Sequence, residues 1–216
     1  MFESFYEKLE DAAIVPVVAL NDAKKAVPLA RALYKGGIPA IEVTFRTDAA
    51  EEAIKLISEE CPEMFVGAGT VINAEQAETA VKAGAKFLVS PGYVEEVADW
   101  AISHKIPFVP GVCTPTDIMN VLLKGLDVMK FFPAEASGGT GMLKNLGGPF
   151  PQVKFMVTGG INLSNVEEYA ATKSVIAIGG SWVSKSSYIE NGEWDTVTKL
   201  SHEAVTKIKE TRLANK

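Results

Sequence analysis

The sequence of 216 residues contains few of the features that mark several classes of protein. It has two cysteines and two histidines, so we expect neither a disulfide framework nor a cluster with metal-ligand spacing. Basic residues form no run and the formal net charge is -6, which argues against nucleic acid as a partner. No apolar run approaches the roughly 20 residues that span a bilayer. The N-terminus lacks the basic start and apolar core of a signal peptide, so a cytoplasmic location is the simplest expectation.

Short apolar, β-branched segments alternate with longer amphipathic segments along the chain. The predicted strands are 14–20, 40–45, 64–69, 86–90, 107–111, 128–132, 154–159 and 175–180. The predicted helices are 22–35, 48–60, 73–83, 94–104, 114–124, 138–146, 163–172 and 194–210. Asp48, Asn73, Thr114 and Ser164 are of the types that cap helix N-termini. Because the strands are apolar throughout and do not alternate, they are typical of parallel strands covered by helices.

Eight strand–helix units in a chain of this length predict a (β/α)8 TIM barrel, with residues 1–216 as a single domain. The amphipathic start, MFESFYEKLEDA, is expected to add an N-terminal helix. The alternative is a doubly wound open sheet that binds a dinucleotide. That fold favours an early glycine-rich loop, whereas the first strand here runs into ALNDAKKA, which has no glycine.

The active site of such a barrel forms at the carboxyl-terminal ends of the strands, where the sixth strand carries Lys130 in VMKFF. Apolar surroundings disfavour a charged ammonium, and a neutral amine can attack a ketone to form an imine. The other interpretation is an edge lysine that reaches solvent or pairs with an acid. Glu42 in AIEVTF is expected to face the lumen, with Ile41 and Val43 facing the helices. It can serve Lys130 as a general acid/base or as half of a structural pair.

Arg46 and two glycine pairs are further candidates for ligand binding. Arg46 is one of three arginines beside eighteen lysines, and it follows a strand end close to Glu42. Its guanidinium can hold a carboxylate bidentately, although a surface arginine is the alternative. Gly-Gly pairs follow the last two strands in TGGIN and IGGSW, with Ser181 after the second. Barrel enzymes often bind phosphate there, although glycine pairs also serve turns.

Six short segments occur in a recognisable order. IEVTFRT, VGAGTV, SPG, KFFPAE, TGGIN and IGGSW, at these intervals, resemble those of the family of 2-keto-3-deoxy-6-phosphogluconate and 4-hydroxy-2-oxoglutarate aldolases. The resemblance runs from about Ile14 to Ala204. It implies a class I aldolase on a (β/α)8 barrel that uses no metal or other cofactor and is usually a homotrimer.

The resemblance also implies a role for each matching residue. Lys130 is the Schiff-base lysine and Glu42 the general acid/base. The implied substrate-binding residues are Arg46, Thr70, Pro91, Phe132, Gly159, Gly160, Gly180 and Ser181. The first two hold the keto-acid carboxylate, the next two line the pocket, and the last four bind a distal phosphate. The implied reaction yields pyruvate and glyceraldehyde 3-phosphate from 2-keto-3-deoxy-6-phosphogluconate, a step of the Entner–Doudoroff pathway.

Other functions remain open at this point. The substrate could be the phosphogalactonate epimer or the unphosphorylated 4-hydroxy-2-oxoglutarate. A non-catalytic barrel that binds a phosphorylated ligand, with a structural Glu42–Lys130 pair, is a third possibility, because fold alone does not define function. The partners expected from the resemblance are a small phosphorylated keto acid and pyruvate, with neither nucleic acid nor membrane.

Overall fold

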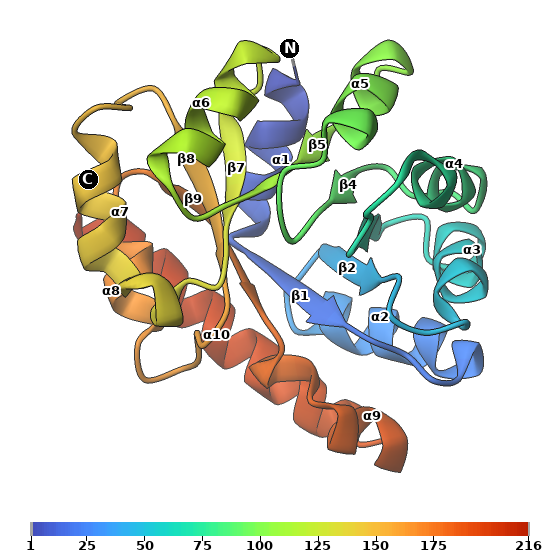
Figure 1. Cartoon of the computed structure of the whole chain (residues 1–216). Helices are drawn as coiled ribbons and strands as arrows, with labels where there is room; N and C mark the ends of the chain where they lie inside the picture. The colour runs from blue at the N-terminus through green and yellow to red at the C-terminus, as the bar shows by residue number, and fades with distance from the viewer. Residues whose placement is uncertain (1, 216) are drawn as a thin grey trace.

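The computed structural model describes residues 2–215, which form a parallel β-barrel surrounded by helices (Figure 1). The strands are β1 (Ile14–Val18), β2 (Ala40–Thr44), β3 (Phe65–Gly69), β4 (Leu88–Val89), β5 (Phe108–Val109), β6 (Gly111–Val112), β7 (Val128–Phe131), β8 (Lys154–Thr158) and β9 (Val175–Gly180). Seven of the eight predicted strands are confirmed as single strands, the one predicted at 107–111 is divided, and all the pairings between neighbours are parallel.

The helices lie outside the ring of strands (Figure 1). They are α1 (Glu3–Ala12), α2 (Ala26–Lys35), α3 (Ala50–Glu60), α4 (Ala74–Lys82), α5 (Glu95–Ser103), α6 (Pro115–Leu123), α7 (Gly139–Gly147), α8 (Val166–Ala170), α9 (Ser186–Asn191) and α10 (Trp194–Ala214). Short 3-10 turns occur at η1 (Ala23–Lys25), η2 (Glu135–Ser137) and η3 (Trp182–Ser184). The predicted helices are confirmed, whereas α9 was not predicted. In the part of the chain described, no helix has the length and hydrophobicity required to cross a membrane.

The barrel closes through a bend at Pro110. The hydrogen-bonded order of the strands is β5-β4-β3-β2-β1-β9-β8-β7-β6, so the two outermost strands are consecutive in the chain. Pro110 has no N–H with which to extend a strand ladder, and it separates β5 from β6. Its carbonyl still accepts a 2.8 Å hydrogen bond from the amide of Lys130. The single strand predicted at 107–111 is therefore two short strands, and the barrel has nine strands among the described residues.

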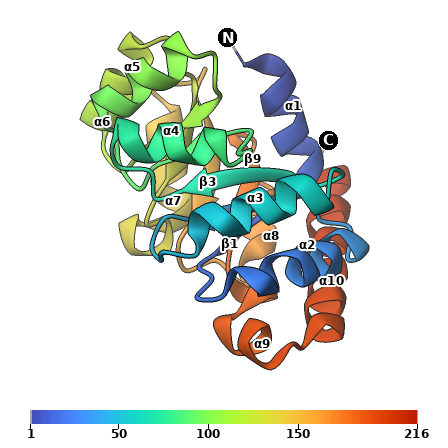
Figure 2. The ribbon, with the colours of Figure 1, turned by 90° about the vertical axis from the view of Figure 1, so that its right-hand side faces the viewer.

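Aromatic side chains fill the amino-terminal end of the barrel. The ring of Phe87 lies 5.3 Å from that of Phe5 in α1 and 5.2 Å from that of Phe65 in β3. Gly67 leaves room for Phe87, since a Cβ atom there would overlap the ring. In Figure 2, α1 lies on the side of the barrel where β3 begins. The predicted N-terminal helix thus helps to close this end of the barrel, which leaves the carboxyl-terminal end as the place where a ligand site can form.

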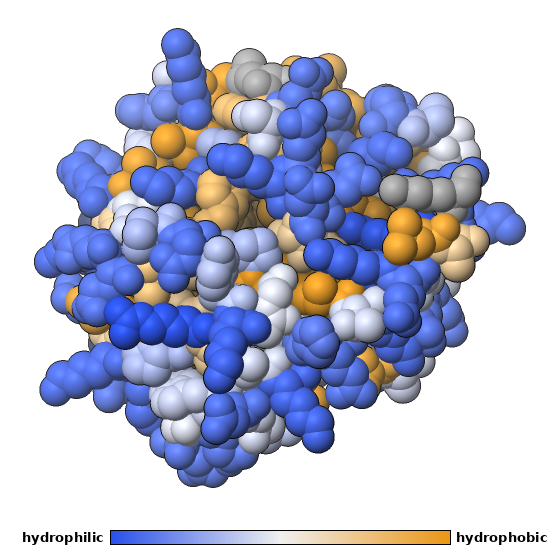
Figure 3. Space-filling model, turned by 180° about the vertical axis from the view of Figure 1, so that it is seen from behind, coloured by the Kyte–Doolittle hydropathy of each residue, from blue (hydrophilic) through white to orange (hydrophobic). Residues whose placement is uncertain are grey.

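The surface on the side of α1 is mostly hydrophilic. Seen from behind, the molecule presents hydrophobic residues only in small patches separated by hydrophilic ones (Figure 3). The apolar side chains that the sequence places in the strands are instead buried, and every residue of β2 and β9 is inaccessible to solvent or nearly so. Burial of both faces of the strands explains why their sequences do not alternate between apolar and polar residues.

Candidate active site

Lys130 and Glu42 meet in the lumen of the barrel. Each is the third residue of its strand, β7 and β2 respectively, and their exposed fractions are 5% and 0%. The Nζ atom of Lys130 lies 3.1 Å from Oε1 of Glu42. Because β1, β9 and β8 separate the two strands along the ring, the pair bridges the lumen. The two residues predicted to carry the chemistry are thus in contact, and Lys130 is not an edge lysine that reaches solvent.

The carboxylate of Glu42 fits because its neighbour has no side chain. Gly69, at the end of β3, is the register partner of Thr44 in β2. A Cβ atom at position 69 would overlap Oε1 of Glu42. Within residues 2–215, the other carboxylate oxygen, Oε2, is buried and has no hydrogen-bond partner. One oxygen of Glu42 therefore engages Lys130, and the second retains its capacity to accept a hydrogen bond.

Of the predicted pocket residues, Phe132 contacts Lys130 and Pro91 packs against the strand next to it. The centroid of the Phe132 ring lies 5.4 Å from Nζ of Lys130. Gly111 in β6 is the register partner of Lys130, and a Cβ atom there would overlap the carbonyl group of Pro91. The turn that contains Pro91 therefore packs against the strand next to Lys130.

Thr44 orients Arg46. The hydroxyl of Thr44, whose side chain is buried, donates a 2.9 Å hydrogen bond to the carbonyl of Val18 in β1. The same oxygen accepts a 3.0 Å hydrogen bond from Nε of Arg46. With Nε engaged, the two terminal nitrogens of the guanidinium remain as donors for a planar anion.

A cavity of about 190 Å³ lies where β1, β2, β7, β8 and β9 end. It is lined by Val17, Arg46, Phe132, Thr158, Gly159, Gly160, Ile161, Gly180 and Ser181. Six of the ten predicted site residues are in this lining. Lys130, Glu42, Thr70 and Pro91 are not, and Lys130 adjoins the cavity through its contact with Phe132.

The glycine pairs contribute backbone groups to the cavity wall. Gly159 and Gly160 have φ angles of +108° and +80°, which favour glycine. In residues 2–215, the amides of Gly160 and Ile161 have no backbone acceptor. Ser181 directly precedes the short 3-10 turn η3. Unpaired amides at a concave turn are suited to an anion.

Thr70 follows Gly69, next to the carboxylate of Glu42. Its φ angle of +57° is uncommon for a β-branched residue. Backbone strain of this kind costs about 1–3 kcal/mol and clusters at functional sites. Thr70 is close to the Lys130–Glu42 pair, but it does not line the cavity that contains Arg46.

Thr44 and Thr158 are polar residues of the site that the sequence did not single out. Oγ1 of Thr158 is buried and lacks a hydrogen-bond partner among the described residues. Thr158 lines the cavity, and its register partner Gly179 leaves room for it, since a Cβ atom there would overlap the hydroxyl. The sequence feature that could have identified these two threonines is their position inside IEVTFRT and TGGIN, on the lumenal side of their strands.

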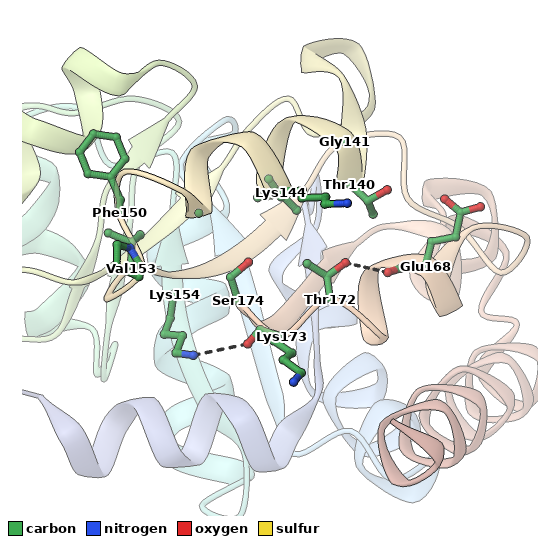
Figure 4. A pocket seen from close by; sticks show the side chains of 13 residues that line it. Thr140, Gly141, Lys144, Phe150, Val153, Lys154, Glu168, Thr172, Lys173 and Ser174 are labelled. Atoms are coloured by element: carbon green, nitrogen blue, oxygen red, sulfur yellow. Dashed lines mark hydrogen bonds between the residues drawn. The ribbon is translucent and has the colours of Figure 1, made fainter. Parts of the chain in front are cut away.

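A larger hollow, of about 590 Å³, lies on the flank of the barrel between α7 and the segments that flank β8 (Figure 4). Lys144, Lys154 and Lys173 are among its lining residues, and the Nζ atom of Lys154 donates to the carbonyl of Lys173 at 3.4 Å. These lysines are exposed, and none of the predicted site residues contributes to this hollow. Among the described residues, no group of three or more His, Cys, Asp or Glu side chains is placed to hold a metal ion.

A parallel barrel with a buried lysine–glutamate pair near its carboxyl-terminal end defines a class of enzyme, the lyases that form an imine with a keto substrate. The model of the KDPG and KHG aldolase family matches residues 5–200. Here KDPG is 2-keto-3-deoxy-6-phosphogluconate and KHG is 4-hydroxy-2-oxoglutarate. The chain belongs to the KDPG and KHG aldolase family.

Individual relatives agree with this assignment. The 2-dehydro-3-deoxy-phosphogluconate aldolase of Treponema pallidum is 46% identical, over 94% of this chain and 96% of the relative. The KDPG aldolase of Legionella pneumophila, solved with pyruvate as a covalent carbinolamine, is 42% identical with a TM-score of 0.87, over 90% of this chain and 96% of that one. The aldolase of Zymomonas mobilis ZM4, solved with 3-phosphoglycerate, is 40% identical with a TM-score of 0.85, over 92% and 94% of the two chains. The resemblance seen in the six segments is confirmed.

Proposed function

We propose that the chain is a class I aldolase that cleaves KDPG to pyruvate and glyceraldehyde 3-phosphate, and that it also acts on KHG. The observation that carries the proposal is the buried amine of Lys130, 3.1 Å from the carboxylate of Glu42 at the carboxyl-terminal end of the barrel. The covalent pyruvate in the Legionella enzyme supports an imine mechanism. With KDPG as substrate, the enzyme serves the Entner–Doudoroff pathway.

Catalysis begins with proton transfer from the ammonium of Lys130 to Glu42, which leaves a free amine. The amine attacks C2 of the keto acid to give a carbinolamine. Glu42 returns its proton to the hydroxyl of the carbinolamine, which leaves as water, so that a protonated imine and an ionised Glu42 remain. Glu42 then removes the proton of the C4 hydroxyl, and the C3–C4 electron pair moves toward the imine nitrogen as the aldehyde leaves. Protonation of the enamine at C3 and hydrolysis of the imine release pyruvate and regenerate Lys130.

The two ends of the substrate have separate binding groups. Arg46 and Thr70 hold the keto-acid carboxylate, Pro91 and Phe132 line the pocket around the ketone, and the groups that bind the distal phosphate are Gly159, Gly160, Gly180 and Ser181. The exposed amides of the TGGIN turn and the 3-phosphoglycerate bound by the Zymomonas enzyme support a phosphate subsite. Fixing both ends orients C2 for attack by Lys130.

The imine itself is the electron sink of this mechanism, so we propose that neither a metal nor another cofactor takes part. Dialysis against EDTA should therefore leave kcat unchanged. A loss of activity that added divalent metal restores would contradict this part of the proposal.

Borohydride trapping tests the imine. Wild-type protein incubated with pyruvate and sodium borohydride should gain one reduced adduct, located on Lys130 by peptide mass spectrometry. Lys130→Met should gain none and should lose cleavage activity, whereas Lys154→Met, at an exposed lysine, should behave as wild type. Cleavage at the wild-type rate by Lys130→Met would overturn the imine mechanism. Ligand binding without turnover by the wild-type protein would instead favour a non-catalytic phosphate-binding barrel.

Substrate preference distinguishes the remaining alternatives. Comparison of kcat/KM for KDPG, its galactonate epimer and KHG should rank KDPG first. A higher value for the epimer would assign the enzyme to that substrate. A higher value for KHG would count against a phosphate role for the two glycine turns.

We also propose that residues 1–216 form one domain, that the domain assembles as a homotrimer, and that it works in the cytoplasm. Exposed apolar side chains support assembly. Ile72, Met119 and Leu123 are 51%, 49% and 84% exposed, and the last two lie one turn apart on α6. Sedimentation equilibrium should give a mass of three chains, and cell fractionation should recover the protein with cytoplasmic markers.

A further inference from the structure

Glu135 and Tyr169 form a polar contact that the proposed mechanism does not use. Glu135 lies five residues after Lys130, in η2. Its Oε1 accepts a hydrogen bond from the hydroxyl of Tyr169, which is a fully buried residue of α8. Burial, reinforced by the nearby carboxylate of Glu135, raises the pKa of Tyr169 well above its usual value. The phenol therefore remains protonated and continues to donate.

Glu135 packs behind the TGGIN turn. Its amide donates a 3.0 Å hydrogen bond to the carbonyl of Gly159, and the amide of Ala134 donates a 2.8 Å bond to the carbonyl of Thr158. A Cβ atom at Gly160 would lie 2.7 Å from both Cβ and Cγ of Glu135. The side chain of Glu135 thus occupies the space beside Gly160, and its contact holds the turn to the segment that follows Lys130.

The Glu135 carboxylate lies outside the cavity. A Cβ atom at Gly139, at the start of α7, would lie 3.2 Å from Oε1 of Glu135 and 3.3 Å from the hydroxyl of Tyr169. Glu135 is not among the residues that line the cavity, whereas Gly159 and Gly160 are. The hydrogen bond from Tyr169 therefore keeps a negative charge on the far side of the turn, where it does not meet an anionic ligand.

We propose that Glu135 and Tyr169 are positioning residues that hold the TGGIN turn in the conformation that binds the distal phosphate of the substrate. The inference rests on the proposed phosphate subsite and adds to it the groups that shape the turn. It also connects the strand that carries Lys130 to the opposite end of the substrate. Neither residue touches the reacting atoms.

The test separates phosphate binding from imine chemistry. Tyr169→Phe and Glu135→Ala should raise KM for KDPG about tenfold. Exchange of the methyl protons of pyruvate with deuterated water should stay within about twofold of wild type, because pyruvate forms the imine but carries no phosphate. Glu135→Gln should restore KM, since its amide oxygen can accept the same hydrogen bond. Glu168→Ala, at an exposed neighbour of Tyr169, is the matched control and should match wild type.

The outcomes are distinguishable. Equal losses in cleavage and in pyruvate exchange would show a general structural role and overturn the inference. An unchanged KM for KDPG in both Tyr169→Phe and Glu135→Ala would also overturn it. If Tyr169→Phe fails to fold, Glu135→Ala, at a surface residue, decides the matter. If wild-type protein cleaves KDPG no better than KHG and is not inhibited by inorganic phosphate, the phosphate subsite itself is wrong, and this inference fails with it.

Discussion

Gly69 is the residue on which the position of the Glu42 carboxylate depends. We predict that Gly69→Ala lowers kcat for KDPG cleavage by about 10²- to 10⁴-fold, the scale of general acid/base catalysis. The added methyl group would overlap Oε1 of Glu42 and move it away from Lys130. Gly147→Ala is the control, because no atom lies within 4 Å of a Cβ built there. Steady-state kinetics check the prediction, and near-normal turnover by Gly69→Ala would show that Glu42 tolerates displacement.

Thr44 is expected to act through Arg46. We predict that Thr44→Val raises KM for pyruvate in the exchange reaction about tenfold, which corresponds to the loss of one hydrogen bond of ordinary strength. Valine keeps the shape of threonine but removes the acceptor for Nε of Arg46 and leaves the carbonyl of Val18 without this donor. Thr44→Ser keeps the hydroxyl and should restore KM. If Thr44→Ser raises KM as much as Thr44→Val does, the effect comes from packing and not from the hydroxyl.

The pairing of Lys130 with Glu42 could be predicted from strand parity, but the environment of the amine could not. From the sequence, the apolar residues on either side of Lys130 were expected to exclude water from its amine. By the alternation of side chains along a strand, Met129 and Phe131 point toward the helices, and the burial of Lys130 comes from the closed lumen. The roles of Thr44 and Thr158 depend on groups of neighbouring strands, which a local motif does not reveal.

At the scale of elements, the start of α6 is stabilised by a reciprocal cap. The hydroxyl of Thr114 accepts from the amide of Asp117, and the carboxylate of Asp117 accepts from the amides of Cys113 and Thr114. Burial acts to raise the pKa of Asp117, but these hydrogen bonds outweigh it and the pKa is lowered. The cap therefore stabilises the folded state above the unfolded pKa of about 3.9 and is lost as the pH falls through the lower folded pKa.

We predict that Asp117→Ala lowers the free energy of unfolding by about 1 kcal/mol at pH 7. The difference between variant and wild type should shrink below about pH 4, as the carboxylate becomes protonated in the folded protein. Urea titrations of both proteins across this pH range measure the difference. A difference that stays constant down to pH 2 would mean that the charge of Asp117 does not contribute.

The cap residues also show how far element boundaries could be predicted. Asn73 and Thr114 cap α4 and α6 as expected. The prediction was wrong for Asp48, because α3 begins only at Ala50, and for Ser164, whose hydroxyl donates to the side chain of Asn162 ahead of α8. Side-chain turns compete with caps at loop residues, and residue type alone does not decide between them.

At the scale of the whole molecule, the three arginines have three different environments. Arg46 reaches the cavity, and Arg31 lies on the surface, 3.6 Å from Glu60. Arg212 is different because it ties the last helix to the beginning of the chain. Its Nη1 donates to the carbonyl of Glu10 in α1 at 2.9 Å, and its Nη2 donates to the carbonyl of Ile176 in β9 at 2.6 Å. One side chain thus joins α10 both to the helix that plugs the barrel and to a strand of its wall.

We predict that Arg212→Ala lowers the free energy of unfolding by about 2–3 kcal/mol, because the partly buried carbonyl of Ile176 and the exposed carbonyl of Glu10 lose a charged donor. For a chain of this length, that loss lowers Tm by about 5–10 °C. The stability of Arg212→Lys should lie between that of the wild type and that of Arg212→Ala, because one ammonium group cannot reach both carbonyls as the forked guanidinium does.

Arg31→Ala is the control and should change the free energy of unfolding by less than about 0.5 kcal/mol, as expected for an exposed ion pair. Calorimetry measures all three, with KDPG cleavage at 25 °C expected to remain at the wild-type level. Equal shifts in Tm for Arg31→Ala and Arg212→Ala would show that the ends of the chain are not joined through this residue.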